Sequence, residues 1–124
     1  MRYEFLNEGH IADVLAIEKA GGYEVASALG RPNYVLGAFV DNRLVAYCTC
    51  EESEVVPNGL VLADLYVLPE WRSQGIASGL ISFVQKRGFS IGLSPETTAL
   101  KEFYRKFGFK NSHIEGWMYW LPKK

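Results

Sequence analysis

An apolar run in the middle of this chain leads directly into an amphipathic helix. Residues 60–68 read Leu-Val-Leu-Ala-Asp-Leu-Tyr-Val-Leu, which is typical of a strand buried on both faces. A one-sided apolar stripe then recurs at helical spacing, formed by Ile76, Ala77, Leu80, Ile81 and Val84. The sequence therefore predicts a strand–turn–helix unit with Gly75 in the turn.

The start of that helix is predicted to bind an anion. The first N–H groups of a helix have no intrahelical partners and lie at the positive end of the helix dipole. The residues present exclude two known kinds of phosphate-binding loop. The turn lacks the Gly-Lys-Ser/Thr ending of nucleoside-triphosphatase loops, and the spacing of Gly75 and Gly79 does not give Gly-x-Gly-x-x-Gly.

Two motifs on either side of this helix carry a family resemblance. Residues 72–77 read Arg-x-x-Gly-x-Ala and resemble the pyrophosphate-binding signature of the GNAT superfamily of acyl-coenzyme A N-acyltransferases. Residues 97–109 resemble the late helix of the same family, with Phe103-Tyr104 as its aromatic pair and Gly108-Phe109 as its ending. Thr97 departs from the family pattern, because many members have asparagine there.

The order of predicted elements agrees with this resemblance. Strands are expected at residues 2–6, 34–40, 44–50, 60–68, 89–93, 109–111 and 117–121, and helices at 11–19, 75–87 and from about 95, with one or two further turns in 23–29. Residues 41–43, Asp-Asn-Arg, are predicted to form a tight hairpin turn. The resemblance implies an α/β fold: one GNAT-like domain over residues 1–124, with a mixed, mostly antiparallel sheet of six to seven strands flanked by about four helices.

The composition of the chain limits the number of domains and the classes of partner that we expect. With 124 residues and 48% apolar content, the chain is long enough for one core and too short for two. Its net charge of -1 gives no field of the kind that nucleic-acid binders use. The longest apolar stretches are strand-sized, so neither a membrane span nor a signal segment is predicted. A soluble cytoplasmic protein is the expectation.

Cys48 and Cys50 are the only cysteines, and their spacing places both on one side of a strand. That geometry is poor for a disulfide, and the two histidines, His10 and His113, lie apart from them without ligand spacing. Both thiols are interpreted as core or half-buried, and no metal is predicted.

The resemblance implies acetyl-coenzyme A as the acyl donor. Backbone groups of the strand end would pair with its pantetheine arm, and the N–H groups of the turn would hold its pyrophosphate. Arg72 either contacts a phosphate or braces the turn. The residues predicted to contact the donor are Leu65, Tyr66, Val67, Arg72, Ser73, Gln74, Gly75, Ile76, Ala77, Ser78, Thr97 and Phe103.

Two residues are candidates for proton transfer. Tyr104 falls where the family places a tyrosine near the coenzyme A sulfur, and a phenol is protonated at pH 7 and can donate to a thiolate. The alternative is that Tyr104 belongs only to the core. Asp64 is the nearest carboxylate for a general base, because Ala63 and Gly92 stand where many members carry glutamate. Its alternative is a structural, hydrogen-bonded aspartate.

The leading hypothesis is therefore an acetyl-coenzyme A-dependent N-acetyltransferase, in which a primary amine attacks the thioester directly. The acceptor would be a small-molecule amine or a peptide or protein amine, and the sequence does not specify which. A cluster of aromatic residues near the C-terminus, Trp117, Tyr119 and Trp120, is interpreted as core or as the surface of a homodimer. The rival hypothesis is a non-catalytic acyl-coenzyme A-binding or interaction domain that keeps the fold.

Overall fold

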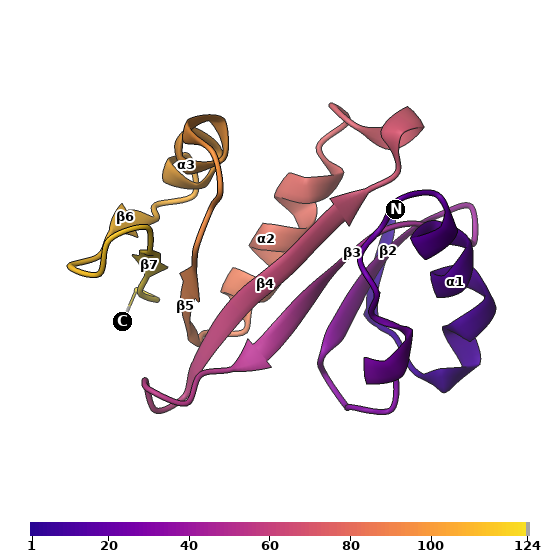
Figure 1. The fold of residues 1–124 in the computed structure, drawn as a ribbon, viewed down its shortest axis with the longest axis horizontal. Helices are drawn as coiled ribbons and strands as arrows, with labels where there is room; N and C mark the ends of the chain where they lie inside the picture. Colours follow the sequence, from indigo (N-terminus) through magenta and orange to yellow (C-terminus); the bar gives the residue numbers. More distant parts are fainter. Residues whose placement is uncertain (124) are drawn as a thin grey trace.

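A computed structural model describes residues 1–123. Seven strands form one twisted sheet in the order β1-β2-β3-β4-β5-β7-β6 (Figure 1). All neighbours are antiparallel except β4 and β5, which are parallel. The predicted fold class is confirmed. The strands are β1 (Arg2–Phe5), β2 (Val35–Val40), β3 (Arg43–Glu52), β4 (Gly59–Val67), β5 (Ser90–Leu93), β6 (Lys110–Asn111) and β7 (Met118–Trp120).

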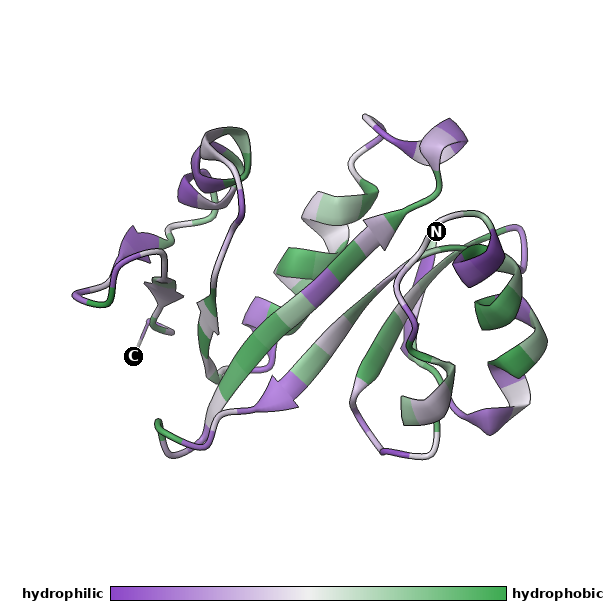
Figure 2. Ribbon diagram, in the orientation of Figure 1, coloured by the Kyte–Doolittle hydropathy of each residue, from purple (hydrophilic) through white to green (hydrophobic). Residues whose placement is uncertain are grey.

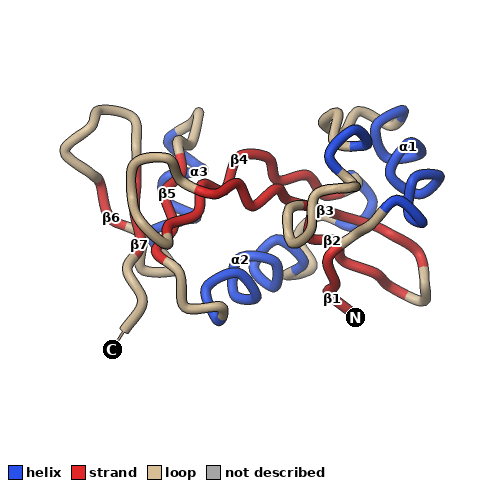
Figure 3. Tube along the Cα trace, turned by 90° about the horizontal axis from the view of Figure 1, so that it is seen from below, coloured by secondary structure: helices blue, strands red, loops and turns tan. Residues whose placement is uncertain are grey.

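Helices lie on both sides of this sheet. Helix α1 (Ile11–Lys19) packs against β3, and α2 (Ile76–Lys86) packs against β2, β3 and β4. Figure 3 shows α1 and α2 on opposite sides of the central strands. Helix α3 (Thr98–Arg105) follows β5. Three short 3-10 turns complete the described elements: η1 (Glu8–His10), η2 (Ala26–Ala28) and η3 (Pro69–Trp71).

The core lies at the central strands. Hydrophobic residues predominate along β2, the middle of β3 and the first half of β4 (Figure 2), and these parts of the strands are largely buried. The inward stripe of α2 completes this core with Ile76, Leu80, Ile81 and Val84, each at most 1% exposed. The hairpin turn between β2 and β3 is confirmed, since Asp41 and Asn42 both have positive φ, as a tight two-residue turn requires.

The helical elements differ from the predicted ones mainly in their number and in where the last helix begins. Residues 23–29 contain one 3-10 turn, η2, which is within the one or two turns predicted. The Glu18 carboxylate accepts hydrogen bonds from the N–H groups of Val25 and Ala26 at the start of that turn, at 2.9 and 2.8 Å. The last helix begins at Thr98 and not near Pro95, because Thr97 adopts an extended backbone and caps it. Three α-helices, and not about four, are present in residues 1–123.

The parallel pair β4 and β5 is short. It is paired only at Gly59↔Ser90, Leu60↔Ile91 and Val61↔Gly92. Beyond Val61 the two strands separate, which Figure 1 shows as a gap between their ribbons. The prediction that the strand is buried on both faces throughout is therefore wrong for its second half, where Ala63 is exposed and residues 64–67 are half-buried.

Candidate acyl-donor site

The separation of β4 from β5 opens a cleft of about 480 Å3 at the end of β4. Its walls come from the last residues of β4, the turn after it, the first residues of α2 and Phe103 of α3. Ten of the twelve predicted donor-contacting residues line it: Leu65, Tyr66, Val67, Arg72, Ser73, Gly75, Ile76, Ala77, Ser78 and Phe103.

Helix α2 begins at this cleft without a side-chain cap. Gly75 is its N-cap residue and has φ +81°, a left-handed conformation that favours glycine. A Cβ added to Gly75 would meet nothing within 4 Å, so the residue faces open space. The N–H groups of Ile76, Ala77 and Ser78 have no acceptor within the helix, because they belong to its first turn. They lie at the positive end of the helix dipole. The site therefore offers an anion several backbone donors in one place.

Arg72 braces the turn. Its Nε donates to the Val67 carbonyl at 2.9 Å, and its guanidinium lies 5.4 Å from the centre of the Tyr66 ring. This supports the bracing role that the sequence left open. The terminal nitrogens form no hydrogen bond or ion pair with residues 1–123, so a phosphate contact remains available to them.

Two further residues line the cleft, although the sequence did not predict that they contact the acyl donor. Trp71 lies in η3, and its indole nitrogen is buried without a hydrogen-bond acceptor within residues 1–123. Tyr23 reaches the cleft from the loop after α1 and packs edge-on against Tyr66, with 6.3 Å between ring centres. Trp71 could have been predicted to line the cleft, because it is adjacent to Arg72 in the sequence. Tyr23 could not, because only the tertiary fold brings its loop to the cleft.

Gln74 and Thr97 do not line the cleft, although both are predicted to contact the donor. The Gln74 side chain donates to the Glu70 carbonyl at 3.2 Å. The Thr97 hydroxyl accepts from the Leu100 N–H at 3.1 Å, which is its capping role in α3. A donor contact for these two residues stays a prediction.

Tyr104 lies in the core beside the cleft. It is 7% exposed and packs edge-on against Phe103 and Phe109, with ring centres 5.3 and 5.6 Å away. Burial raises the pKa of Tyr104 to about 12, with smaller contributions from Cys48 and Tyr23. Its hydroxyl forms no hydrogen bond with the described residues, and it remains protonated at neutral pH.

Asp64 is hydrogen-bonded, as its strand position predicts. Its Oδ2 accepts from the Thr49 hydroxyl at 3.3 Å, and its N–H donates to the same hydroxyl at 3.0 Å. The register between β3 and β4 shifts at this point, between Cys48 and Cys50. This reciprocal pair fixes the carboxylate at a bulge, where strand geometry is locally altered.

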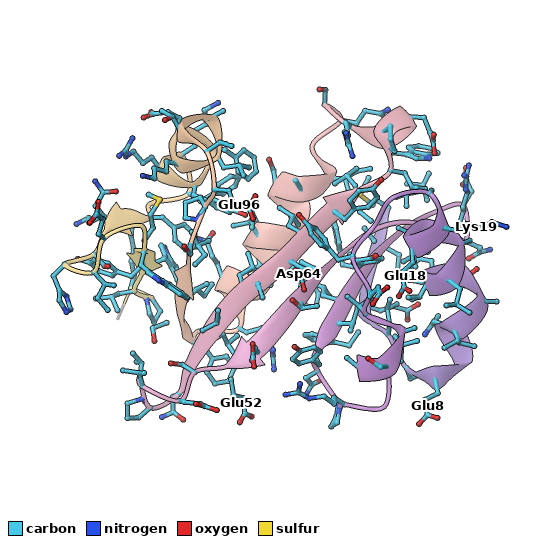
Figure 4. The ribbon with its side chains drawn as sticks, viewed as in Figure 1. Glu8, Glu18, Lys19, Glu52, Asp64 and Glu96 are labelled. Carbon is cyan, nitrogen blue, oxygen red and sulfur yellow. The ribbon has the colours of Figure 1, made fainter. Side chains whose placement is uncertain are left out.

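Negative charge gathers on the α1 side of β4. The Thr49 hydroxyl of β3 holds the Asp64 carboxylate. Figure 4 labels Asp64 on β4 and Glu18 on α1, the helix that packs against β3. Burial raises the pKa of Tyr47, and the carboxylates Glu18 and Asp64 raise it further. That side of the sheet is therefore suited to a cationic group.

The sheet order, the separated parallel pair and the uncapped helix at the cleft define the class of acyl-coenzyme A N-acyltransferases. The chain belongs to the GNAT acetyltransferase family, because residues 31–111 match the acetyltransferase (GNAT) domain. No helix in residues 1–123 is long and apolar enough to cross a membrane.

Relatives share both sequence and fold. Aminoglycoside N(6')-acetyltransferase type 1 of Salmonella typhimurium is 29% identical over 116 residues, which cover 88% of this chain and 69% of the relative. Two solved structures share the fold. The PaiA N-acetyltransferase of Thermoplasma acidophilum in complex with coenzyme A has a TM-score of 0.71 at 17% identity, covering 98% of each chain. The ribosomal-protein-S18-alanine N-acetyltransferase of Escherichia coli has 0.74 at 18% identity, covering 98% of this chain and 92% of the other.

Proposed function

We propose that this protein is an acetyl-coenzyme A-dependent N-acetyltransferase, acting as a single domain over residues 1–124 on a primary amine. The observation that carries the proposal is the uncapped start of α2, which faces an open cleft at the point where β4 leaves β5. Backbone donors there suit the pyrophosphate of the acyl donor. Beyond Val61, the edge of β4 that faces away from β3 has no strand partner in the described part of the chain, which suits the amides of the pantetheine arm.

The proposed reaction is direct attack. The amine nitrogen forms a bond to the thioester carbonyl carbon, the carbon–sulfur bond breaks, and the thiolate leaves. Tyr104 donates a proton to that thiolate, a role its protonated hydroxyl allows. Asp64 accepts the proton that the amine loses, directly or through water. Backbone N–H groups of β4 stabilise the oxyanion of the tetrahedral intermediate.

A cationic acceptor fits the charge of the site. Glu18 and Asp64 both lie close enough to Tyr47 to raise its pKa, and carboxylates attract an ammonium group. An aminoglycoside is one such amine, and it is the acceptor named for the relative from Salmonella typhimurium. Polyamines and peptide N-termini share the same charge and are compared with it below.

The test is an acetyl-transfer assay that follows release of the free thiol. A panel of aminoglycosides, polyamines, amino acids and peptides is offered to the wild type, Tyr104→Phe and Asp64→Asn. We expect turnover of at least one amine, a decrease of about 10- to 1,000-fold in Tyr104→Phe, and an unchanged affinity for acetyl-coenzyme A. Tyr119→Phe, on the exposed face of β7, is the control.

Two outcomes would contradict parts of the proposal. Tight binding of acetyl-coenzyme A with no transfer to any amine would favour the rival, a non-catalytic binding domain, which the residues Ala63 and Gly92 motivate. Full turnover in Tyr104→Phe would remove Tyr104 from the mechanism and leave the donor site intact.

A further inference from the structure

A second cavity lies at the opposite end of β4 and α2 from the donor cleft. It has a volume of about 520 Å3 and shares no lining residue with that cleft in the described part of the chain. Its walls come from the segment before β2, the end of β3, the start of β4 and the residues after α2. Figure 4 shows Glu52 at this end of the sheet, where β3 ends. The volume is in the usual range for small-molecule sites, about 300–1,000 Å3.

Two arginines, Arg31 and Arg87, line this second cavity. Arg31 stacks on the Tyr34 ring, with 3.8 Å from the guanidinium carbon to the ring centre. Arg87 lies 5.2 Å from the ring centre of Phe89 and 4.9 Å from that of Phe5. Stacking holds the guanidinium plane but uses none of its N–H groups.

Neither guanidinium forms an ion pair in the described part of the chain, although the carboxylate of Glu52 lines the same cavity. Within residues 1–123, Arg31 and Arg87 form no ion pair, and neither side chain donates a hydrogen bond. Two arginines with free N–H groups can hold a carboxylate or a phosphate through paired, charge-assisted hydrogen bonds. Both side chains therefore keep N–H groups available for an anion.

The remaining walls are mixed in character. Leu60 and Phe89 supply apolar surface, and Glu52 supplies a hydrogen-bond acceptor. The pKa of the buried Cys50 thiol is lowered, mainly by a hydrogen bond with Cys48. Burial acts in the opposite direction, and the positive charge of Arg87 lowers the pKa further. Arg87 therefore lies close enough to Cys50, another lining residue, to favour its thiolate form.

We propose that this second cavity binds a small organic anion, whose carboxylate or phosphate is held between Arg31 and Arg87. The apolar walls cover the body of the ligand, and Glu52 accepts a hydrogen bond from a hydroxyl or amino group on it. The site is separate from the donor cleft, so it does not depend on the proposed acetyl transfer.

The test follows the arginine Nε–Hε signals of the 15N-labelled protein by NMR. Sodium phosphate and sodium succinate are titrated separately at constant ionic strength, so that the two arms distinguish a phosphate from a carboxylate. We expect a saturable shift of the Arg31 and Arg87 signals and none for Arg43, an exposed arginine at the β2–β3 turn. The Arg72 signal reports separately on phosphate binding at the donor turn.

Variants make the assignment specific. The double variant Arg31→Gln/Arg87→Gln is expected to raise the Kd of the bound anion at least about tenfold, because two charge-assisted contacts are lost. Arg31→Gln alone alters an exposed residue and keeps the test possible if the double variant does not fold. Arg43→Gln is the control. Shifts that never saturate, or an unchanged Kd in the arginine variants, would overturn the proposal.

Discussion

The phenol of Tyr47, a fully buried residue of β3, donates a hydrogen bond to the backbone carbonyl of Tyr23 at 2.6 Å. This bond fastens the loop after α1 to the central sheet. Because Tyr23 lines the donor cleft, the same bond also sets one wall of the site.

Tyr47→Phe is therefore expected to lower the free energy of unfolding by about 1–3 kcal/mol, because the Tyr23 carbonyl loses its donor. Urea unfolding measures this. Amide hydrogen exchange should accelerate in residues 21–25 more than in α2. Equal stability of Tyr47→Phe and wild type would show that the bond does not hold the loop. Tyr119→Phe, which removes an exposed hydroxyl, is the control.

Gly75 and Gly88 form a matched pair at the two ends of α2. Their φ values are +81° and +83°, and a Cβ at either position meets nothing within 4 Å. Gly75→Ala and Gly88→Ala should therefore cost similar stability, about 1 kcal/mol each, from the left-handed backbone alone.

Only Gly75→Ala should weaken coenzyme A binding, because its methyl group enters the donor cleft. We expect the Kd from calorimetry to rise at least about tenfold for Gly75→Ala and to stay within twofold for Gly88→Ala. Equal loss of affinity in both variants would mean that helix stability, and not access to the turn, controls binding.

Trp71 should report donor binding. It lines the cleft, whereas Trp117 and Trp120 do not. Coenzyme A is expected to change the tryptophan fluorescence of the wild type in a saturable way, because a polar ligand enters beside the indole ring. Trp71→Phe should abolish the change and Trp117→Phe should preserve it. A full response in Trp71→Phe would place the donor elsewhere.

Alkaline pH should destabilise the protein through Tyr104. Its pKa is about 12 when folded and about 10 when unfolded, so the unfolded state loses its proton first. The stabilising contribution is complete below about pH 10 and is lost as the pH rises towards 12, with a total on the order of 2 kcal/mol.

Circular dichroism melting at pH 9 and pH 11.5 measures this loss. Tyr104→Phe should show a smaller decrease in Tm between the two pH values than the wild type does. Part of the decrease should persist, because burial also raises the pKa of Tyr47. Identical decreases in both proteins would show that Tyr104 does not titrate as described.

Sequence patterns predict most of the fold because the main elements have strong local signals. The apolar run before Gly75 and the stripe Ile76 to Val84 predict β4 and α2, and both are present. The turn at Asp41 and Asn42 is also predictable, since both residues tolerate positive φ. The mostly antiparallel character of the whole sheet followed from the family resemblance, whereas the pairing of β2 with β3 followed from the turn between them.

The differences arise from tertiary contacts. The Glu18 side chain satisfies the N–H groups of Val25 and Ala26 across seven and eight residues, and no local pattern reveals a carboxylate acting at that distance. Likewise, the strand at Leu60–Leu68 reads as buried throughout, because hydropathy does not show where a neighbouring strand turns away.

The candidate donor site was predictable only in the part that is formed by neighbouring residues of the sequence. Contiguous residues around Gly75 share one turn, so a motif locates them together. Tyr23 comes from a distant loop and has no such signal. Thr97 matches the motif in position, but its hydroxyl is occupied as a helix cap, an alternative role that a threonine before a helix can always adopt.

The three residue pairs that join β4 to β5 have a consequence for cooperativity. The described sheet divides into a block of β1–β4 and a block of β5, β7 and β6, connected through that short ladder and through α2. The second block should open at lower free energy than the first, as a separate foldon. A ligand that bridges Val67 and Phe103 would link the two blocks. Native-state hydrogen exchange should then show the two opening energies converge when the cleft is filled.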